Sequence, residues 1–392
     1  MVPLLALEFW GVRGCCRAFR GGEGLEGVGE PLAAEAPGVA PEGAESAPVA
    51  AEAAEPEPPP PPPPVWQGMV PPTPQKNLLH PDAPGVLQPT ASGRLESAKF
   101  GSVRTANVGG KLVPRFHEGV DIAPTERDRK REPLDGVFAV ADGRVAFVNG
   151  KPGNSEYGRY VVVEHADPSL GVVTNARGNC STGTVYTLYA HLAEVRFGIR
   201  EGREVKAGEE LARMGHSAAS GIPVDRSHLH WEVGLMLNPR YAGYTRANKI
   251  TNVMGAYNGL NLFGIDPLDF YAAHARNPEL AFAEYLETVK PAFEVLARRG
   301  HFPDFFAAFP SLWVGPRGNG EPFWLAFSES GMPLKGRLAT AEEASALGNQ
   351  RQKVWRADRE VLGRNGRALV TQRKGKWELT DKGIRHLDLL FY

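Results

Sequence analysis

The sequence has little of three features that would assign it to a class at once: cysteine, net charge and long apolar runs. Its cysteines are Cys15, Cys16 and Cys180, and their spacing suggests no disulfide framework, so the redox compartment stays open. The formal net charge of -1 argues against a whole-protein binder of nucleic acid or anionic membrane, although local patches remain open. No stretch reaches the roughly 18 apolar residues that span a bilayer, so we expect no transmembrane span.

The first residues give no convincing export signal. Leu4 to Val12 are mostly apolar, but Glu8 interrupts them and no basic residue precedes them. Cys15 suggests a lipoprotein site, whereas Arg13 beside it argues against one. The export route and the true N-terminus therefore stay open at this level.

What the chain does have is length and apolar content enough for a core. With 392 residues, 42% of them apolar, it has room for about two domains of roughly 150 residues each. Composition divides it into residues 1–86, 87–272 and 273–392. The first part is rich in Ala, Glu, Gly and Pro and contains the proline run Pro58 to Pro64. We expect it to be disordered, with a stiff Pro-rich linker that is either a spacer or a tolerated low-complexity tail.

Residues 87–272 show short strand patterns separated by Gly-rich turns. Asp142-Gly143 predicts a hairpin turn between two strands. The predicted strands are Phe138–Val140, Arg144–Val148, Tyr160–Glu164, Val185–Leu192 and Ser227–Val233. This spacing predicts a mainly β domain, an antiparallel sandwich or open barrel.

Residues 273–392 read as mostly helical. Pro278 to Arg299 places apolar residues near helical spacing. From Glu342 to Tyr392 we expect one or two helices, a short strand pair and a final helix, and Trp377 to Gly383 resembles the wing end of a winged helix. That last segment holds eleven Lys or Arg against seven Asp or Glu. A solvated face explains this excess as well as a nucleic-acid partner does, so we expect no nucleic-acid binding.

Three histidine-containing segments carry the chemistry. His117 and Asp121 stand four residues apart around Gly119, and imidazole and carboxylate are both good zinc ligands. On the strand predicted around His228 and His230, alternate residues share a face, so both imidazoles point the same way. Two such histidines need polar partners if buried. A metal ligand beside a catalytic group explains that pairing.

The third segment, Tyr189-Ala190-His191-Leu192, would mean little alone. In this order and context, the three segments resemble the lysostaphin-type (LytM-like) zinc metallopeptidases, which are peptidoglycan endopeptidases. Flanking segments match the family as well: Ser97–Arg104, Ala139–Val145, Gly202–Gly208 and Met214–Ser217. The resemblance covers roughly residues 95–233.

The resemblance implies a site with divided roles. His117, Asp121 and His230 would bind one zinc ion per chain and leave a fourth position for water. His191 and His228 would not bind metal but would take the water's proton and stabilise the oxyanion or the leaving group, in a division that the sequence does not give.

The implied reaction is hydrolysis of peptide crosslinks in bacterial peptidoglycan by a metal-activated water, in the cell envelope, the periplasm or outside the cell. The alternative is a catalytically silent relative that activates cell-wall amidases. Such relatives typically lack ligands or catalytic histidines, whereas this chain keeps all five residues. Which crosslink is cut, the oligomeric state and the role of the C-terminal region stay open.

The chain departs from the family in three insertions: Thr125–Pro133, Gly171–Thr184 and Gly234–Ile265. We expect them near the substrate groove, where they would alter substrate choice rather than the zinc chemistry. Glu118 and Glu232 border ligands and are candidates to bond the second nitrogen of a ligating histidine.

Overall fold

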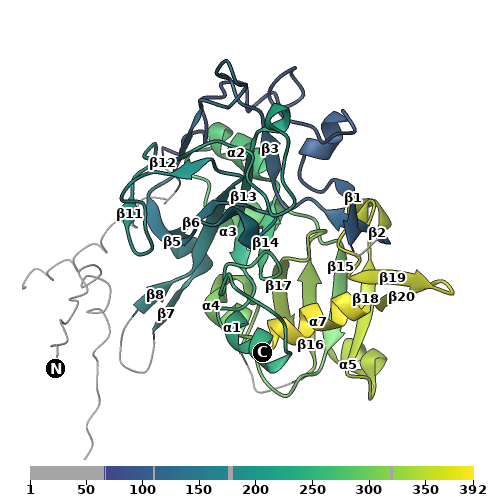
Figure 1. Ribbon diagram of the computed structural model, residues 1–392. Coiled ribbons are helices and arrows are strands. Elements are labelled where there is room, and N and C mark those ends of the chain that lie inside the picture. The colour runs from purple at the N-terminus through teal and green to yellow at the C-terminus, as the bar shows by residue number, and fades with distance from the viewer. Residues whose placement is uncertain (1–65, 67, 109–110, 175–179, 318–320) are drawn as a thin grey trace, which may run out of the picture. The chain divides into compact units, whose positions relative to one another are not determined.

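The computed structural model describes residues 66, 68–108, 111–174, 180–317 and 321–392 (Figure 1). The chain divides near Pro64, and every described residue belongs to the second of its two units, residues 64–392. The proline run and the segment before it, which we expected to be disordered, lie outside the described residues. The second unit is mainly β with antiparallel pairing throughout its named sheets, which confirms the expected fold class.

The largest sheet has seven strands and carries the predicted motif strands. Its order is β11-β5-β6-β9-β13-β14, and β3 pairs with the end of β13 that β14 leaves free (Figure 1). The strands are β3 (Val120–Ile122), β5 (Gly143–Asn149), β6 (Tyr160–Ala166), β9 (Thr184–Ala190), β11 (Glu204–Val205), β13 (Leu229–Met236) and β14 (Leu262–Ile265). Three of the predicted strands therefore form its centre as β6, β9 and β13.

The predicted hairpin at Asp142-Gly143 is wrong. Its first strand, β4 (Gly136–Phe138), pairs with β12 (Glu210–Arg213) in a three-stranded sheet completed by β10 (Glu194–Val195). Its second strand, β5, pairs with β6 and β11 in the large sheet. The Asp-Gly turn instead carries the chain from one sheet to the other, and Gly143 is needed because a Cβ there would lie 2.7 Å from the Glu164 carbonyl oxygen.

Two further hairpins flank the sheets: β1 (Val103–Val108) with β2 (Lys111–Phe116), and β7 (Val172–Thr174) with β8 (Cys180–Thr182). The helices are α1 (Tyr241–Ala247), α2 (Pro267–Arg276), α3 (Phe282–Thr288), α4 (Asp304–Ala308), α5 (Ala341–Leu347), α6 (Arg359–Leu362) and α7 (Asp381–Leu390). Among the described helices, none has the length and apolar character to cross a membrane.

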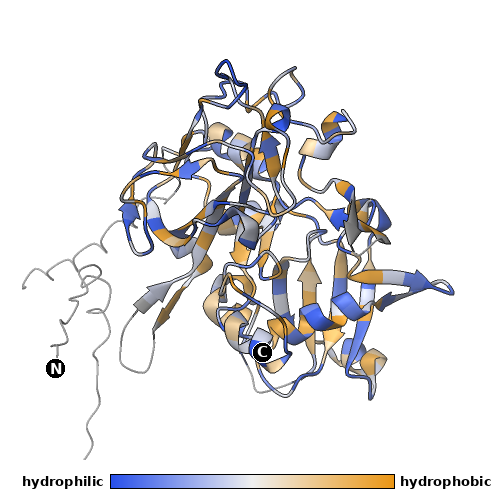
Figure 2. Ribbon diagram, in the orientation of Figure 1, coloured by the Kyte–Doolittle hydropathy of each residue, from blue (hydrophilic) through white to orange (hydrophobic). Residues whose placement is uncertain are grey.

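The C-terminal region is less helical than predicted. A four-stranded antiparallel sheet, in the order β17-β16-β15-β18, lies at its centre. The strands are β15 (Phe293–Ala297), β16 (Phe323–Phe327), β17 (Pro333–Leu338) and β18 (Gln352–Ala357). The helix expected over residues 278–299 ends at Thr288, because Pro291 cannot continue it and the following residues are buried in β15. Figure 2 shows the inner strands of this sheet as largely hydrophobic.

The end of the chain follows the predicted order more closely. After α5 and α6 comes the strand pair β19 (Val370–Arg373) and β20 (Lys376–Leu379), and then α7. Thr380 caps α7 by accepting from the Gly383 amide. The outer end of this hairpin is hydrophilic in Figure 2, whereas its base packs against the core through Val370.

The segment before residue 87 also differs from the expectation of disorder. Trp66, Leu78 and Val86 are buried and belong to the main apolar cluster. The Trp66 indole nitrogen donates to Asp167 Oδ2 at 2.9 Å. Composition did not predict this order, because a few large apolar side chains, spaced well apart in the sequence, are enough to pack the segment against the core. The same cluster includes Val233 of β13, Val295 of β15 and Leu390 of α7, so a single core runs through both sheets.

Candidate metal centre

Strand pairing brings the three predicted ligands together from distant parts of the sequence. β3 pairs with β13 so that Asp121 lies directly opposite His230. Opposed residues in an antiparallel pair have Cβ atoms about 5 Å apart, which is close enough for both side chains to reach one ion. His117 begins the turn between β2 and β3, and Gly119 lets this turn approach β13, because a Cβ there would lie 2.3 Å from the Trp231 carbonyl oxygen.

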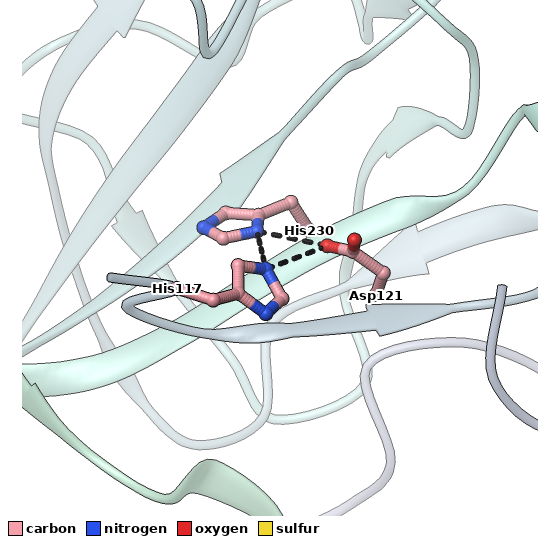
Figure 3. Close-up of side chains that lie close together, drawn as sticks. All are labelled: His117, Asp121 and His230. Carbon is pink, nitrogen blue, oxygen red and sulfur yellow. Dashed lines mark hydrogen bonds and ion pairs between the residues drawn. The ribbon is translucent and has the colours of Figure 1, made fainter. Parts of the chain in front are cut away.

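The three side chains converge on one point (Figure 3). His117 Nε2 lies 3.0 Å from Asp121 Oδ1 and 3.1 Å from His230 Nδ1. His230 Nδ1 lies 3.0 Å from Asp121 Oδ1. All three residues are buried, with at most 5% of each exposed. They form a triangle of potential ligand atoms with nearly equal sides.

The outer nitrogen of each ligand imidazole fixes which nitrogen faces the triangle. His117 Nδ1–H donates to the Lys99 carbonyl oxygen at 2.8 Å, and His230 Nε2–H donates to Glu232 Oε1 at 2.9 Å. A neutral imidazole with its proton so placed presents a lone pair from its other nitrogen. Three acceptor atoms therefore face one another, and a cation between them would satisfy all three.

Glu232 is held as firmly as the histidine it orients. This carboxylate is fully buried, and it accepts from Tyr157 Oη at 2.6 Å and from Tyr186 Oη at 3.0 Å. Burial alone would raise the pKa of Glu232, but the hydrogen bonds from His230 and the two tyrosines lower it. Glu232 therefore stays ionised beside His230. The suggestion that Glu232 supports a ligand agrees with this geometry, whereas Glu118 contacts Arg367 instead.

The charges around Asp121 favour its ionised form. Burial alone would raise the pKa of Asp121, but His117, His228 and Arg104 hold it well below the usual range. Arg104 Nη2 donates to Asp121 Oδ2 at 2.5 Å, so the other carboxylate oxygen is left to face the histidines. Sequence reasoning placed Arg104 in a family-like strand but gave it no role. Its position ten or more residues before the motif carried no local signal.

The residues fit a zinc ion. Tetrahedral ligands about 2.0–2.1 Å from zinc would be about 3.3 Å apart, close to the separations seen here. Burial disfavours the charged form of His230, but hydrogen bonds to Asp121 and Glu232 raise its pKa to about 9, so a cation bound here would replace a proton on Nδ1. The cluster therefore favours a positive charge at this point. Two histidines and one carboxylate also match the donor types of catalytic zinc sites, which keep one position open.

His191 and His228 lie beside this triangle. His191 follows Ala190 of β9, which pairs with His230, and His228 immediately precedes β13. The His191 ring centroid lies 4.7 Å from that of His228 and 5.8 Å from that of His230. His228 Nε2 is 3.5 Å from Asp121 Oδ1. The structure thus brings all five predicted residues into one cluster.

Backbone carbonyls orient both of these rings. His191 Nδ1–H donates to the Ser217 carbonyl oxygen at 2.8 Å, and His228 Nδ1–H donates to that of Arg226 at 2.7 Å. Each neutral ring therefore presents an unprotonated Nε2. His191 also has a left-handed backbone with φ of 61°, which is uncommon outside glycine and accumulates at functional sites.

Both rings favour the neutral form. Burial lowers the pKa of His191 well below its usual value, and the neighbouring His228 and His230 lower it further. Burial likewise lowers the pKa of His228, against the opposing charge of Asp121. Neutral imidazoles at pH 7 can accept a proton, so these two residues suit general acid–base roles.

The three insertions lie in different places. Thr125–Pro133 does contact the site frame: Arg127 Nη1 donates to the Val224 carbonyl oxygen at 2.8 Å, just before His228. In the third insertion, Gly259 packs against Tyr157, since a Cβ there would lie 2.8 Å from Tyr157 Oη. Its ends simply continue the large sheet as β13 and β14.

The expectation that Gly171–Thr184 emerges near the site is wrong. This insertion joins the first residue of β9, whereas His191 follows the last, and seven strand residues span roughly 20 Å. Its base packs on the C-terminal region instead: a Cβ at Gly171 would lie 2.4 Å from Pro310 Cγ, and one at Gly183 would lie 3.1 Å from Phe309 Cδ1.

Comparison with known proteins gives partial matches over the same region. Residues 115–240 match Peptidase family M23. The murein hydrolase activator NlpD of Escherichia coli (strain K12) is 28% identical over 141 residues, which are 33% of this chain and 28% of that protein. Lipoprotein NlpD of Yersinia enterocolitica is 29% identical over 106 residues, 26% of this chain and 84% of that protein. The chain thus spans 28% of the length of the murein hydrolase activators that it matches.

Solved structures also resemble this chain over only part of its length. A zinc containing peptidase from Vibrio cholerae is 27% identical, with a TM-score of 0.23, over 35% of this chain and 32% of that one. The catalytic domain of lysostaphin from Staphylococcus simulans is 17% identical, with a TM-score of 0.25, over 44% of this chain and 87% of that one. The family match includes all five clustered residues and the strands β3, β9 and β13, which hold or border four of them. Residues 115–240 of this longer chain therefore form a domain of Peptidase family M23.

Proposed function

We propose that this chain is a zinc-dependent endopeptidase that hydrolyses peptide crosslinks of bacterial peptidoglycan. The observation that carries the proposal is the pair of neutral imidazoles, His191 and His228, beside a buried triangle of three ligand atoms. A binding module needs neither the triangle nor the oriented histidines. The substrate class comes from the M23 match and from the murein-related relatives.

His117, Asp121 and His230 are the proposed ligands. When bound there, zinc supplies a lowered pKa for a coordinated water and polarises the scissile carbonyl. Around that chemistry the chain contributes fixed groups: Arg104 holds Asp121, and Glu232 holds His230 in the tautomer that presents Nδ1. Both supports are built before any substrate arrives.

His191 and His228 are the proposed proton carriers. Each presents an unprotonated Nε2, because its Nδ1–H is bound to a backbone carbonyl. One imidazole can accept the proton of the attacking water, and an imidazolium so formed can return a proton to the leaving amine nitrogen. The positive charge would also stabilise the oxyanion. Their low pKa values keep both rings unprotonated at neutral pH, so each Nε2 keeps its lone pair.

The second candidate function is activation of a separate cell-wall amidase. The observation that favours it is the name of the relatives, murein hydrolase activator. The intact ligand set and both oriented histidines favour hydrolysis. The same relatives support residence in the cell envelope, with peptidoglycan as the contacted polymer. We further propose that residues 273–392 are an addition to the peptidase domain, with which they share one apolar core.

Hydrolysis is tested with the purified chain and insoluble peptidoglycan of several crosslink types. Soluble fragments are identified by mass spectrometry with zinc, with a chelator, and with zinc restored. We expect chelator-sensitive release of fragments with new amino termini within the crosslink. Release of fragments only when an amidase is added, equally with and without chelator, would support the activator function and contradict ours.

A further inference from the structure

The C-terminal region reaches the metal motif through a largely buried ion pair. Arg367 Nη1 donates to Glu118 Oε1 at 3.0 Å. Glu118 stands between the proposed ligand His117 and Gly119, in the turn that leads to Asp121. The Arg367 and Glu118 side chains are 11% and 20% exposed. Salt screens the attraction within such a pair much less than that within a surface pair. Loss of either partner leaves the other charge unpaired and partly shielded from water.

Arg367 also lies near two aromatic rings. Its guanidinium lies 5.4 Å from the ring centroid of Phe116 and 4.7 Å from that of Phe263. Phe116 is the last residue of β2, immediately before His117, and Phe263 lies on β14 beside β13. The planar cation therefore connects the two elements that flank the metal motif.

The loop that presents Arg367 is unusually constrained. Asn365 and Ala368, on either side of it, have left-handed backbones with φ of 49° and 53°. Asn365 Nδ2 donates to the Val370 carbonyl oxygen at 2.7 Å, and Thr380 Oγ1 donates to that of Ala368 at 2.6 Å. Strained conformations of this kind persist only where the surroundings fix them, and they accumulate where a side chain must be aimed.

The same loop contacts the hairpin before the motif. A Cβ at Gly366 would lie 2.6 Å from Val103 Cγ2 and 3.4 Å from Phe116 Cα, so glycine permits this approach. Figure 1 shows β1 and β2 beside the C-terminal segment, in agreement with these contacts. Two guanidinium nitrogens of Arg367, Nε and Nη2, are buried without a hydrogen-bond partner among the described residues. The contact with Glu118 therefore carries the polar anchoring of this side chain.

We propose that Arg367 is a positioning residue for the metal centre: by holding Glu118, it fixes the turn that carries His117 and Asp121. The region outside the M23 match is thus part of the metal-binding unit. This inference rests on the proposed metal site but not on hydrolysis. Outer partners of ligands commonly contribute tenfold to a hundredfold in metal affinity, and Arg367 acts on the ligands through Glu118 and the backbone.

The experiment measures zinc affinity of the full chain by competition with a chromophoric chelator. We expect Arg367→Met to weaken zinc binding about tenfold. Glu118→Ala should weaken it similarly, and the double variant should weaken it little beyond either single change, because both act through one contact. Arg367→Lys should recover part of the loss, since the charge remains while the planar stacking is lost.

The matched control is Arg337→Met. Arg337 pairs with Glu343 at 2.8 Å and lies 4.4 Å above the Trp324 ring, so it makes the same two kinds of contact in the C-terminal region without touching the motif. We expect Arg337→Met to lower the melting temperature of the metal-free chain as Arg367→Met does, with zinc affinity within twofold of wild type. If Arg367→Met weakened zinc binding only through a general loss of stability, Arg337→Met would weaken it by a similar factor.

Folded Arg367→Met with wild-type zinc affinity, or additive effects in the double variant, overturns the inference. If Arg367→Met does not fold, Arg367→Lys decides, and unchanged affinity in that variant overturns it. A wild type that binds zinc but releases no peptidoglycan fragments contradicts the proposed hydrolysis alone. A wild type that binds no zinc contradicts both.

Discussion

The imidazole rings of His191 and His228 meet edge to face, with their centroids 4.7 Å apart, although they come from the ends of different strands. The Nδ1–H of each ring donates a hydrogen bond to a backbone carbonyl oxygen, so Nε2 carries the lone pair. Burial lowers the pKa of both rings. Under the proposed function, this pair transfers the proton and the neighbouring triangle binds the cation.

His191→Ala and His228→Ala should each retain zinc and fold but lose at least about a hundredfold in turnover, the scale of general acid–base groups. Metal analysis and fragment release from peptidoglycan measure the two properties separately. His216→Ala is a control, because His216 bonds the Ile222 carbonyl oxygen and a Glu132 carboxylate rather than facing the triangle. Loss of zinc in either main variant would identify that residue as a ligand and refute its assigned role.

His117→Ala, Asp121→Ala and His230→Ala should each abolish zinc retention or weaken it severely, because each removes one of three protein ligands. Glu232→Gln should give a smaller loss, about tenfold to a hundredfold, because it keeps the ligand but weakens its support. Metal content after dialysis and competition with a chelator distinguish the severe loss of zinc binding from the smaller one. Full zinc occupancy in Asp121→Ala contradicts the assignment of this triangle.

Stability should fall in mild acid because two buried histidines resist protonation. Burial lowers the pKa of His165 to about 4, and burial and Arg367 lower that of His386 to about 3. The unfolded chain takes up these protons near pH 6.5, so it binds more protons than the folded chain between there and pH 4, and stability is lost as the pH falls through that window.

The His386 part of this effect can be isolated. His386→Gln keeps a donor for the Gly331 carbonyl oxygen but does not titrate. Between pH 7 and pH 5, wild type should lose about 2 kcal/mol more unfolding free energy than this variant. Denaturant unfolding at the two pH values measures the difference. Equal losses in both proteins contradict a lowered pKa at His386.

The boundary of the folded unit should lie between Pro64 and Trp66. Deletion of Met1 to Pro64 should leave the melting temperature nearly unchanged, because that composition favours no stable packing. Trp66→Ala should cost about 3–5 kcal/mol, because the ring is fully buried 5.2 Å from Phe270 and its indole nitrogen bonds Asp167. Thermal unfolding of both variants tests the contrast. A large fall on deletion to Pro64 shows that the N-terminal segment packs.

The site could be predicted from sequence because its chemistry is encoded in short motifs. His228 and His230 alternate on one strand, and Asp121 follows His117 at a fixed spacing, and the resemblance of these motifs to the lysostaphin-type peptidases implied the ligand set. The partners that hold these side chains could not be predicted this way. Tyr157 and Arg367 reach the site only through the fold, and no local signal marks either.

The fold was also predicted wrongly where pairing between distant segments overrides the local sequence pattern. The Asp142-Gly143 turn has hairpin chemistry, but the strands on its two sides pair with different sheets, which is a tertiary choice. Apolar residues from Phe293 to Ala297 satisfy helical spacing in the sequence, yet burial between β16 and β18 makes them a strand. Periodicity is ambiguous for such short apolar runs.

The insertion Thr125–Pro133 gives a final prediction, which concerns turnover rather than metal. Arg127 donates hydrogen bonds to three backbone carbonyl oxygens in the turn before His228. Its Nη1 donates to the Val224 carbonyl oxygen at 2.8 Å. Its Nη2 donates to the carbonyl oxygens of Asp225 at 3.3 Å and Ser227 at 3.4 Å. The carbonyl between them, of Arg226, is the one that orients His228. Removal of the guanidinium should let this turn shift, and small misplacements of a catalytic group are costly to rate.

Arg127→Met should therefore retain zinc, because the ligand strands β3 and β13 do not depend on this turn, and should lower turnover about tenfold with little change in KM. Arg131→Met is the matched control: its side chain is 64% exposed and its ion pair with Asp225 belongs to the class that contributes little. Zinc content, kcat and KM of both variants are measured on a soluble crosslinked peptide. If Arg127→Met turns over at the wild-type rate, the insertion does not position His228, and if it loses zinc, the turn supports the ligands instead.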